Sequence, residues 1–245
     1  MANKNQSQST HGASQAHPKA WLLAVAAPKE LDAVLQSAKF TGDLPVLWEL
    51  CRLSDRVDVV WTGVGKANAA GGVARVLDTD RHLGVLSVGV AGALPGSDLA
   101  LCDVVCADRS VFGDEGVETP NGFVPMGELG FGAFASDSDS IKHDQSTVDW
   151  LGAYADHIGP VACVSLCSGT DEQASQLLSR TDAIGEAMEG AAVALAANRV
   201  DPSIRTGELR VISNTTGDRD AQQWDLDGAL KKLTHVLGRL IQEAN

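Results

Sequence analysis

The segment GEAMEGAAVALA, Gly185–Ala196, carries two carboxylates just before a run of small residues. Glu186 and Glu189 lie three positions apart. Acidic side chains at the start of a helix interact with unpaired N–H groups and with the helix dipole, which gives both residues a structural explanation. A carboxylate at a strand-to-helix turn can also hold the hydroxyl groups of a polar substrate. From these residues alone, both interpretations remain open.

A second polar group follows the apolar run in RVISNTTGDRDAQQW, Arg210–Trp224. Ser213 and Asn214 come at the expected end of a strand, and Asp218 and Arg219 lie in the polar loop behind it. An amide donates and accepts hydrogen bonds at once, which suits a purine edge with N7 and O6. The alternative is an Asx turn beside a surface cluster of charges.

A third candidate is the glycine-rich turn VGVAGAL, Val88–Leu94. Val90, Ala91 and Gly92 would bring backbone N–H groups close to a ligand, although a tight turn alone also explains small residues. The segment lacks the GxxxxGK[ST] pattern of a phosphate-binding loop, and GVGKANAAGG lacks the dinucleotide fingerprint.

Composition narrows the class of protein. The chain has 245 residues, a formal net charge of −13 and only 4% aromatic residues. These values argue against nucleic-acid binding, and no apolar run is long enough to span a membrane. The five cysteines form an odd set without a secretory signal, which predicts reduced thiols and a cytoplasmic protein. Cys102/Cys106 and Cys163/Cys167 lie in runs predicted to be strands, where a four-residue step is too long for a shared metal ion.

The elements that would position these residues alternate between strands and helices. The polar segment 1–18 is expected to be a disordered tail, and 19–245 a single domain. Predicted strands include WLLAVAA, PVLWELCR, RVDVVWTG, GVLSVGVAGAL, LALCDVVCAD, VACVSLC and ELRVISN. Helices are expected in KELDAVLQSA, KANAAGGVARVLD and Ser146–His157, at Asp171–Arg180, after Glu189 and at Asp227–Glu243, whereas the pattern weakens between Ser110 and Ile141.

This alternation predicts a mostly parallel sheet covered on both faces, with ligands bound at the carboxyl ends of the strands. The positions just after the strands are therefore candidate site residues. They are Pro28–Glu30, Gly63–Lys66, Gly89–Gly92, Ser168–Thr170 with Thr170 as a substrate contact, Met188–Glu189 and Ser213–Asn214.

The glycine-rich turn, EAMEGAA at a strand-to-helix junction and RVISN at the next strand end together resemble the nucleoside phosphorylase and nucleosidase superfamily, from about Trp21 to the C-terminus. GVGKANAA, GFVPMG, EAMEGAA and ISNTTGDRDAQQW are most similar to the futalosine hydrolases of the alternative menaquinone pathway. The resemblance implies an α/β fold in one domain, with a mixed, mostly parallel central sheet flanked by helices. It also implies a purine nucleoside substrate, no metal or organic cofactor, and a homo-oligomer of two or more copies.

The resemblance further implies roles for particular residues. Glu189 would accept hydrogen bonds from the 2′- and 3′-hydroxyls of the ribose, with Met188 packed against the sugar. Glu30 would orient the attacking water, with Lys29 and Asp32 as rivals for that position. Asn214 stands where adenine-releasing nucleosidases usually have a proton-donating aspartate, so the chain is expected to favour a 6-oxopurine such as hypoxanthine. Glu186 remains either structural or directed into the pocket.

The implied reaction is hydrolysis of futalosine to hypoxanthine and dehypoxanthine futalosine. Alternatives are another purine nucleosidase, acting on aminodeoxyfutalosine, methylthioadenosine or S-adenosylhomocysteine, or a purine nucleoside phosphorylase. A phosphorylase relative would have an arginine after the first strand, where this chain has APKEL; Lys29 keeps that alternative open. A nucleoside-binding protein without activity is a third possibility.

The long middle loop contains NGFVPMG, Asn121–Gly127. Futalosine carries a carboxyphenyl-type group in place of the 5′-hydroxyl, and Phe123, Pro125 and Met126 could cover it. The same residues could equally anchor the loop on the core, because apolar loop residues serve both purposes.

Overall fold

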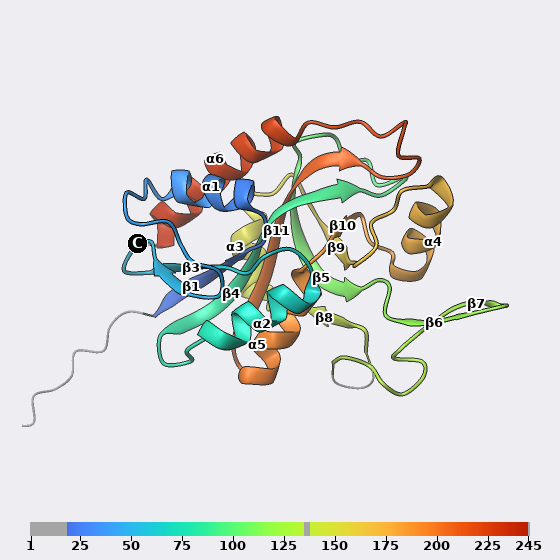
Figure 1. Cartoon of the computed structure of the whole chain (residues 1–245), viewed down its shortest axis with the longest axis horizontal. Coiled ribbons are helices and arrows are strands. Elements are labelled where there is room, and N and C mark those ends of the chain that lie inside the picture. Colours follow the sequence, from blue (N-terminus) through green and yellow to red (C-terminus); the bar gives the residue numbers. More distant parts are fainter. Residues whose placement is uncertain (1–18, 135–137, 245) are drawn as a thin grey trace, which may run out of the picture.

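The computed structural model describes residues 19–134 and 138–244 (Figure 1). The predicted tail, 1–18, lies outside the described residues. Within the described part, none of the helices combines the length and the apolar composition that a membrane span needs.

The centre of the molecule is a nine-stranded mixed sheet in the order β10-β9-β5-β11-β4-β1-β3-β2, with β8 paired to β5. A separate hairpin, β6–β7, projects from it (Figure 1). The strands are β1 (Ala20–Val25), β2 (Leu50–Arg52), β3 (Val57–Trp61), β4 (His82–Ala93), β5 (Val104–Phe112), β6 (Gly116–Thr119), β7 (Gly122–Pro125), β8 (Ser140–Lys142), β9 (His157–Cys163), β10 (Gly185–Ala187) and β11 (Arg205–Thr215).

Strand β4 organises the sheet because it has three partners. Its first half pairs in parallel with β1, and Gly84–Ala93 pair in parallel with β11. Its last residues, Gly92 and Ala93, also pair antiparallel with β10. Since β10 also pairs with β9, and β9 with β5, the strands β4, β11, β5, β9 and β10 form a closed ring. The carboxyl ends of β4 and β11 therefore meet β10 at one end of this ring.

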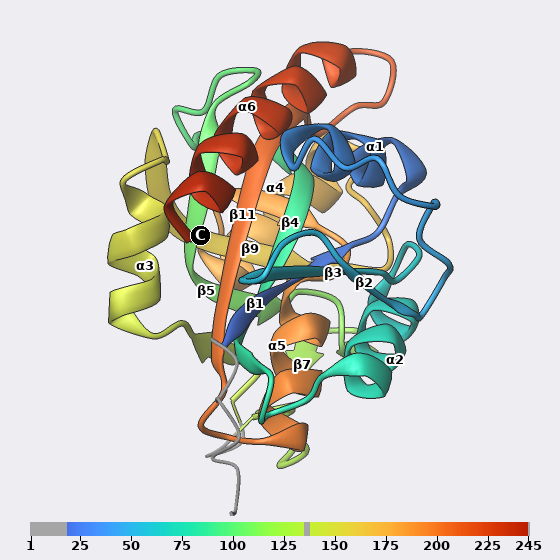
Figure 2. The same cartoon turned by 90° about the vertical axis from the view of Figure 1, so that its left-hand side faces the viewer.

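Helices cover both faces of the sheet (Figure 2). The first apolar cluster packs α1, α3 and α6 on one face, against Trp21, Leu23 and Val25 of β1. A second cluster packs α2 and α5 on the other face, against Leu22 and Ala24. This alternation along β1 is what a strand buried on both faces requires. The helices are α1 (Pro28–Ser37), α2 (Lys66–Val76), α3 (Gln145–Gly152), α4 (Asp171–Thr181), α5 (Gly190–Val200) and α6 (Leu226–Ala244).

Several predicted boundaries are wrong for local reasons. In PVLWELCR only Leu50–Arg52 forms a strand, because Trp48 has a φ of 62° and its indole N–H donates to the Thr62 carbonyl oxygen. LALCDVVCAD becomes a strand only at Val104, since Cys102 has a φ of 69°. Strand β9 ends at Cys163, so Cys167 is also outside it. The strand spacing assumed for the two cysteine pairs is therefore incorrect.

Candidate active site

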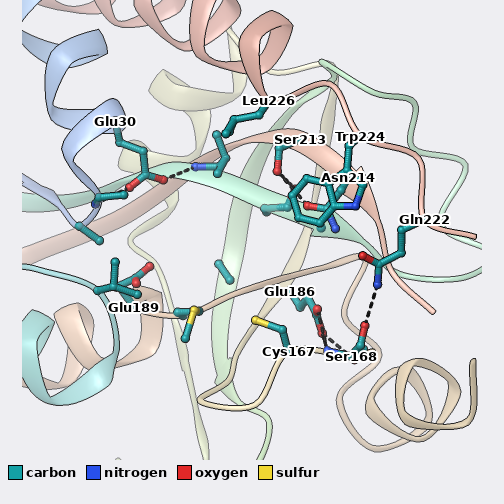
Figure 3. A pocket seen from close by; sticks show the side chains of 18 of the residues that line it. Glu30, Cys167, Ser168, Glu186, Glu189, Ser213, Asn214, Gln222, Trp224 and Leu226 are labelled. Carbon is teal, nitrogen blue, oxygen red and sulfur yellow. Dashed lines mark hydrogen bonds between the residues drawn. The ribbon is translucent and has the colours of Figure 1, made fainter. Parts of the chain in front are cut away.

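A cavity of about 450 Å³ opens at the carboxyl ends of the strands (Figure 3). Segments that are far apart in the chain supply its walls, as expected for an α/β sheet. Of the residues selected from the sequence, those that line it are Glu30, Val90, Ala91, Gly92, Ser168, Gly169, Glu186, Met188, Glu189, Ser213, Asn214 and Arg219. Thr170, Asp218, Phe123, Pro125 and Met126 are not part of its lining.

Glu30 is fixed at the beginning of α1. Its Oε2 accepts a 2.8 Å hydrogen bond from the Ala27 N–H, which caps the helix, and its Oε1 accepts one of 2.8 Å from the Val90 N–H on β4. Burial raises the pKa of this carboxyl, while Arg210 and the two N–H groups oppose that effect. Its rivals from the sequence, Lys29 and Asp32, are exposed and do not line the cavity.

Glu189 immediately precedes α5 and contacts Arg210. Its Oε1 accepts a 3.0 Å hydrogen bond from the Gly65 N–H, and its Oε2 lies 3.5 Å from Nη1 of Arg210. The carboxylate is buried but borders the cavity. One of the opening acids is thus held rigidly at the cavity wall.

Arg210 is a buried charged residue beside Glu189 that the sequence analysis missed. Its guanidinium is fully buried, its Nε donates to Glu208 Oε1 over 2.8 Å and its Nη2 to Ser87 Oγ over 2.7 Å. Burial lowers the pKa of Arg210, but Glu208, Glu189 and Glu30 together outweigh this and raise it. A signal was available: Glu208 and Arg210 lie two apart in a strand predicted to be buried, where charges must be paired.

Two glycines leave the space that this charged cluster occupies. A Cβ at Gly89 would overlap Glu30 and would lie 2.8 Å from Nη1 of Arg210. A Cβ at Gly190 would overlap the carboxylate of Glu208. The glycine of EAMEGAA, Gly190, is therefore required because the Glu208 carboxylate on β11 occupies the space that a side chain would need.

Behind Arg210, buried polar residues continue away from the cavity. Glu208 accepts a hydrogen bond from Ser110, whose hydroxyl lies 2.9 Å from Nε2 of His143; Nδ1 of His143 lies 2.9 Å from the Thr206 hydroxyl. Burial lowers the pKa of His143 to about 4, so the ring is neutral at pH 7. This chain of contacts supports Oε2 of Glu208, while Nε of Arg210 donates to Oε1.

Asn214 reaches the cavity through an irregularity in β11. The register with β4 shifts between Ile212 and Asn214, so Asn214 pairs with Gly92 and Ser213 is the extra residue. A one-residue bulge reverses the face on which the following side chain lies. The Ser213 hydroxyl donates to Asn214 Oδ1 over 2.9 Å, and Nδ2 donates to the Thr215 carbonyl oxygen over 2.9 Å.

The polar loop after β11 folds over this end of the cavity. The Arg219 guanidinium lies 4.8 Å from the ring centroid of Trp224, and both residues line the cavity. Asp218 is exposed and its N–H donates to Asp171, while Thr170 caps α4 by accepting from the Gln173 N–H at 3.2 Å. Thr170 and the backbone of Asp218 thus contact the first turn of α4, outside the cavity lining.

Within the middle segment, residues 116–125 form a hairpin that the sequence analysis did not predict. Phe123 and Pro125 belong to β7 and line a second cavity of about 240 Å³ beside Arg180, whose guanidinium lies 4.6 Å from the Phe123 ring centroid. The Met126 N–H donates to the Glu115 carbonyl oxygen over 3.1 Å. A role for Phe123, Pro125 and Met126 in covering the substrate remains a prediction. Among the described residues, no group of His, Cys, Asp and Glu side chains forms a metal site.

Comparison with known proteins identifies the family. The model of the phosphorylase superfamily matches residues 24–243. Futalosine hydrolase from Acidothermus cellulolyticus is 35% identical over 222 residues, covering 89% of each chain. Futalosine hydrolase from Streptomyces coelicolor is 33% identical over 228 residues, covering 89% of this chain and 94% of the relative.

The chain belongs to the futalosine hydrolase family of the phosphorylase superfamily.

Solved structures confirm the fold of this superfamily member. The S-adenosylhomocysteine nucleosidase from Streptococcus pyogenes, in complex with 5-methylthiotubericidin, gives a TM-score of 0.74 at 22% identity, covering 95% of this chain and 99% of the other. A futalosine hydrolase mutant from Helicobacter pylori gives 0.70 at 20% identity, covering 92% and 100%. The predicted single α/β domain of the nucleoside phosphorylase type is confirmed.

Proposed function

We propose that the chain hydrolyses the N-glycosidic bond of futalosine and releases hypoxanthine. Relatives that are 33–35% identical over most of the chain are futalosine hydrolases. The observation that carries the proposal is the convergence of Glu30, Glu189 and Asn214 on one cavity. In this proposal they bind the attacking water, the ribose and the purine base, respectively.

Glu189 binds the ribose in this proposal. Its carboxylate borders the cavity next to Met188 and is an acceptor for the 2′- and 3′-hydroxyls. Hydrogen bonds from the sugar to an anion stabilise the positive charge that develops on the ribose as the bond to the base breaks. Arg210 and the Gly65 N–H keep the carboxylate oriented when the site is empty.

Glu30 is the general base that positions and deprotonates water. Two backbone N–H groups hold its carboxylate, and burial raises the pKa of the carboxyl toward the range in which it accepts a proton effectively. Asn214 completes the machinery by donating a hydrogen bond to the departing base. An amide cannot transfer a proton, which suits hypoxanthine as a leaving group better than adenine.

Hydrolysis is favoured over phosphorolysis by the charges after β1. Glu30 faces the cavity, whereas Lys29 is exposed and outside its lining. A carboxylate at this position repels a phosphate dianion. The test is hypoxanthine release from futalosine with and without phosphate: equal rates support the hydrolase, phosphate dependence supports a phosphorylase, and binding without release supports a non-enzymatic nucleoside-binding protein.

Glu189→Gln tests the assignment of the sugar site. We expect base release to fall at least about a hundredfold, as for other groups that stabilise a transition-state charge, with an unchanged circular dichroism spectrum. Near-normal activity would contradict ribose binding by Glu189.

We also propose that the protein is a homo-oligomer. Apolar side chains at 44–50 and at Val64 are exposed, and Val64 lines the cavity. Exposed apolar residues gathered in one region are typical of protein interfaces. Light scattering coupled to size exclusion tests this proposal, and a monomer would refute it.

A further inference from the structure

Glu186 is a buried acid at the cavity that the mechanism above does not use. It lies on β10, is 5% exposed and lines the cavity (Figure 3). Ser168 supplies its hydrogen bonds: the backbone N–H lies 3.0 Å from Oε1 and 3.2 Å from Oε2, and the hydroxyl donates to Oε2 over 2.7 Å. Within the described part of the chain, no cationic side chain forms an ion pair with it.

The sheet register places Glu186 and Asn214 on either side of Gly92. Glu186 pairs with Gly92 from β10, and Asn214 pairs with Gly92 from β11. A Cβ on Gly92 would lie 3.1 Å from Asn214 Nδ2 and 3.6 Å from Glu186 Cγ. The methyl group of Thr216 lies 2.8 Å from the same point, so the Asn214 amide and the Glu186 side chain lie close together beside it, and both residues line the cavity.

These two side chains present a hydrogen-bond donor and an acceptor to the same cavity. One N–H of Asn214 is used by the Thr215 carbonyl and its oxygen by Ser213, so a second N–H of the amide is available to a ligand. An ionised Glu186 can only accept, and Ser168 leaves lone pairs of its carboxylate unused. Burial raises the pKa of Glu186, whereas the Ser168 hydrogen bonds favour the ionised form.

This arrangement distinguishes two kinds of purine. A 6-oxopurine has acceptors at N7 and O6 and a donor at N1–H, whereas a 6-aminopurine has a donor at N6 and an acceptor at N1. A carboxylate opposite N1 therefore gains a hydrogen bond from hypoxanthine and meets a lone pair of adenine. A buried acceptor left without its donor is the strongest means of rejecting an analogue.

Building on the proposed function, we propose that Glu186 determines base specificity. It accepts a hydrogen bond from N1–H of a 6-oxopurine, while Asn214 donates to the N7 and O6 edge. Glu186 thereby makes the enzyme select futalosine over its 6-amino analogue.

The experiment measures the affinities of the free bases hypoxanthine and adenine by calorimetry, in the wild type and in Glu186→Gln. We expect the wild type to bind hypoxanthine more tightly. In the variant the ratio of the two affinities should fall by about 10- to 100-fold, the range for a hydrogen bond to a charged group. Base release from futalosine and from its 6-amino analogue should change in the same direction.

Two controls separate recognition from anchoring of the Ser168 loop. Ser168→Ala removes the hydroxyl contact and keeps the backbone one, so it should weaken both bases equally. Glu186→Asp keeps the negative charge but moves the carboxylate away from the base, because the side chain is one methylene shorter. It should weaken the binding of hypoxanthine without strengthening the binding of adenine. If Glu186→Gln changes the affinities for the two bases equally, so that their ratio stays the same, the proposal is overturned. Thermal unfolding shows whether the variants are folded.

The two proposals fail separately. If the wild type releases no base from any nucleoside while Glu186→Gln still alters the preference between free bases, the proposed reaction is wrong and the specificity assignment stands. If futalosine is hydrolysed but the preference between free bases is unaffected, only the role of Glu186 is wrong.

Discussion

Arg210→Met should destabilise the protein more than any single change at the cavity wall. The guanidinium and the Glu208 carboxylate are each 1% exposed and joined by a 2.8 Å hydrogen bond. Methionine fills much of the arginine volume but leaves Glu208 charged and buried, with the Ser110 hydroxyl as its remaining side-chain donor among the described residues. The variant should also be inactive, because Glu189 loses its ion pair and Glu30 a neighbouring positive charge.

The size of the effect follows from the burial of this pair. Breaking a buried ion pair by removing one partner costs about 3–5 kcal/mol. Total stabilities are about 5–15 kcal/mol, so the loss is a large part of the free energy of unfolding. For a chain of this length it corresponds to a fall in Tm of roughly 6–20 °C. Urea titration followed by circular dichroism measures the free energy, and a thermal scan measures Tm.

A double variant separates stability from catalysis. Arg210→Met combined with Glu208→Leu removes both charges, and replacing a buried pair with apolar residues is often neutral or stabilising. Ser110 keeps its contact with His143. We expect the double variant to recover at least half of the lost free energy and to stay inactive. A loss of less than about 1 kcal/mol in Arg210→Met, or no recovery in the double variant, would refute the description of Glu208 as an otherwise uncompensated buried charge.

Four further predictions follow from the same contacts. Because burial raises the pKa of Glu30 above 4.5, kcat/KM should rise with pH through a midpoint above that value, and an acid limb at or below 4.5 in a pH–rate profile would exclude Glu30 as the base. Gly89→Ala should lower kcat about a hundredfold by displacing Glu30, with the native circular dichroism spectrum retained; a normal kcat would contradict the crowding. His143 has a pKa of about 4 in the fold against an ordinary value of 6.5, so its contribution to the free energy of unfolding is complete above pH 6.5 and is lost as the pH falls toward 4. The loss is about 3 kcal/mol, and urea titrations of His143→Gln should no longer show it. Phe123→Ala should lower futalosine turnover more than inosine turnover, since Phe123 lines a neighbouring pocket together with Ser168 of the main cavity; an equal loss for both substrates would exclude a role of the hairpin in covering the 5′-substituent.

The strand ends could be predicted because they depend on local patterns. Apolar runs followed by small or polar residues located Glu30, Glu189 and Asn214 at the edge of the sheet where ligands bind. The strand-to-helix junction in EAMEGAA predicted the short strand β10, but not the ring that closes through it, since the antiparallel pairing of three residues with β4 depends on tertiary packing.

The parts of the site that were missed have two physical origins. Arg210 and Glu208 form a buried ion pair inside β11, whereas the prediction considered the residues that follow the strands. The pairing of Glu186 and Asn214 across Gly92 depends on the bulge at Ser213, because one residue more or less in β11 would reverse the orientation of Asn214. No periodicity in the sequence reveals such an insertion.

The close approach of Gly190 to Glu208 links the evolutionary histories of the two positions. An alanine at 190 would force the Glu208 side chain to move, because its methyl group would overlap the carboxylate. An alignment of relatives should therefore show substitutions at the two positions together, with an alanine in place of Gly190 accompanied by a smaller or apolar residue in place of Glu208. The residues at 190 and 208 would then divide the superfamily into members with a buried acid next to Arg210 and members without one.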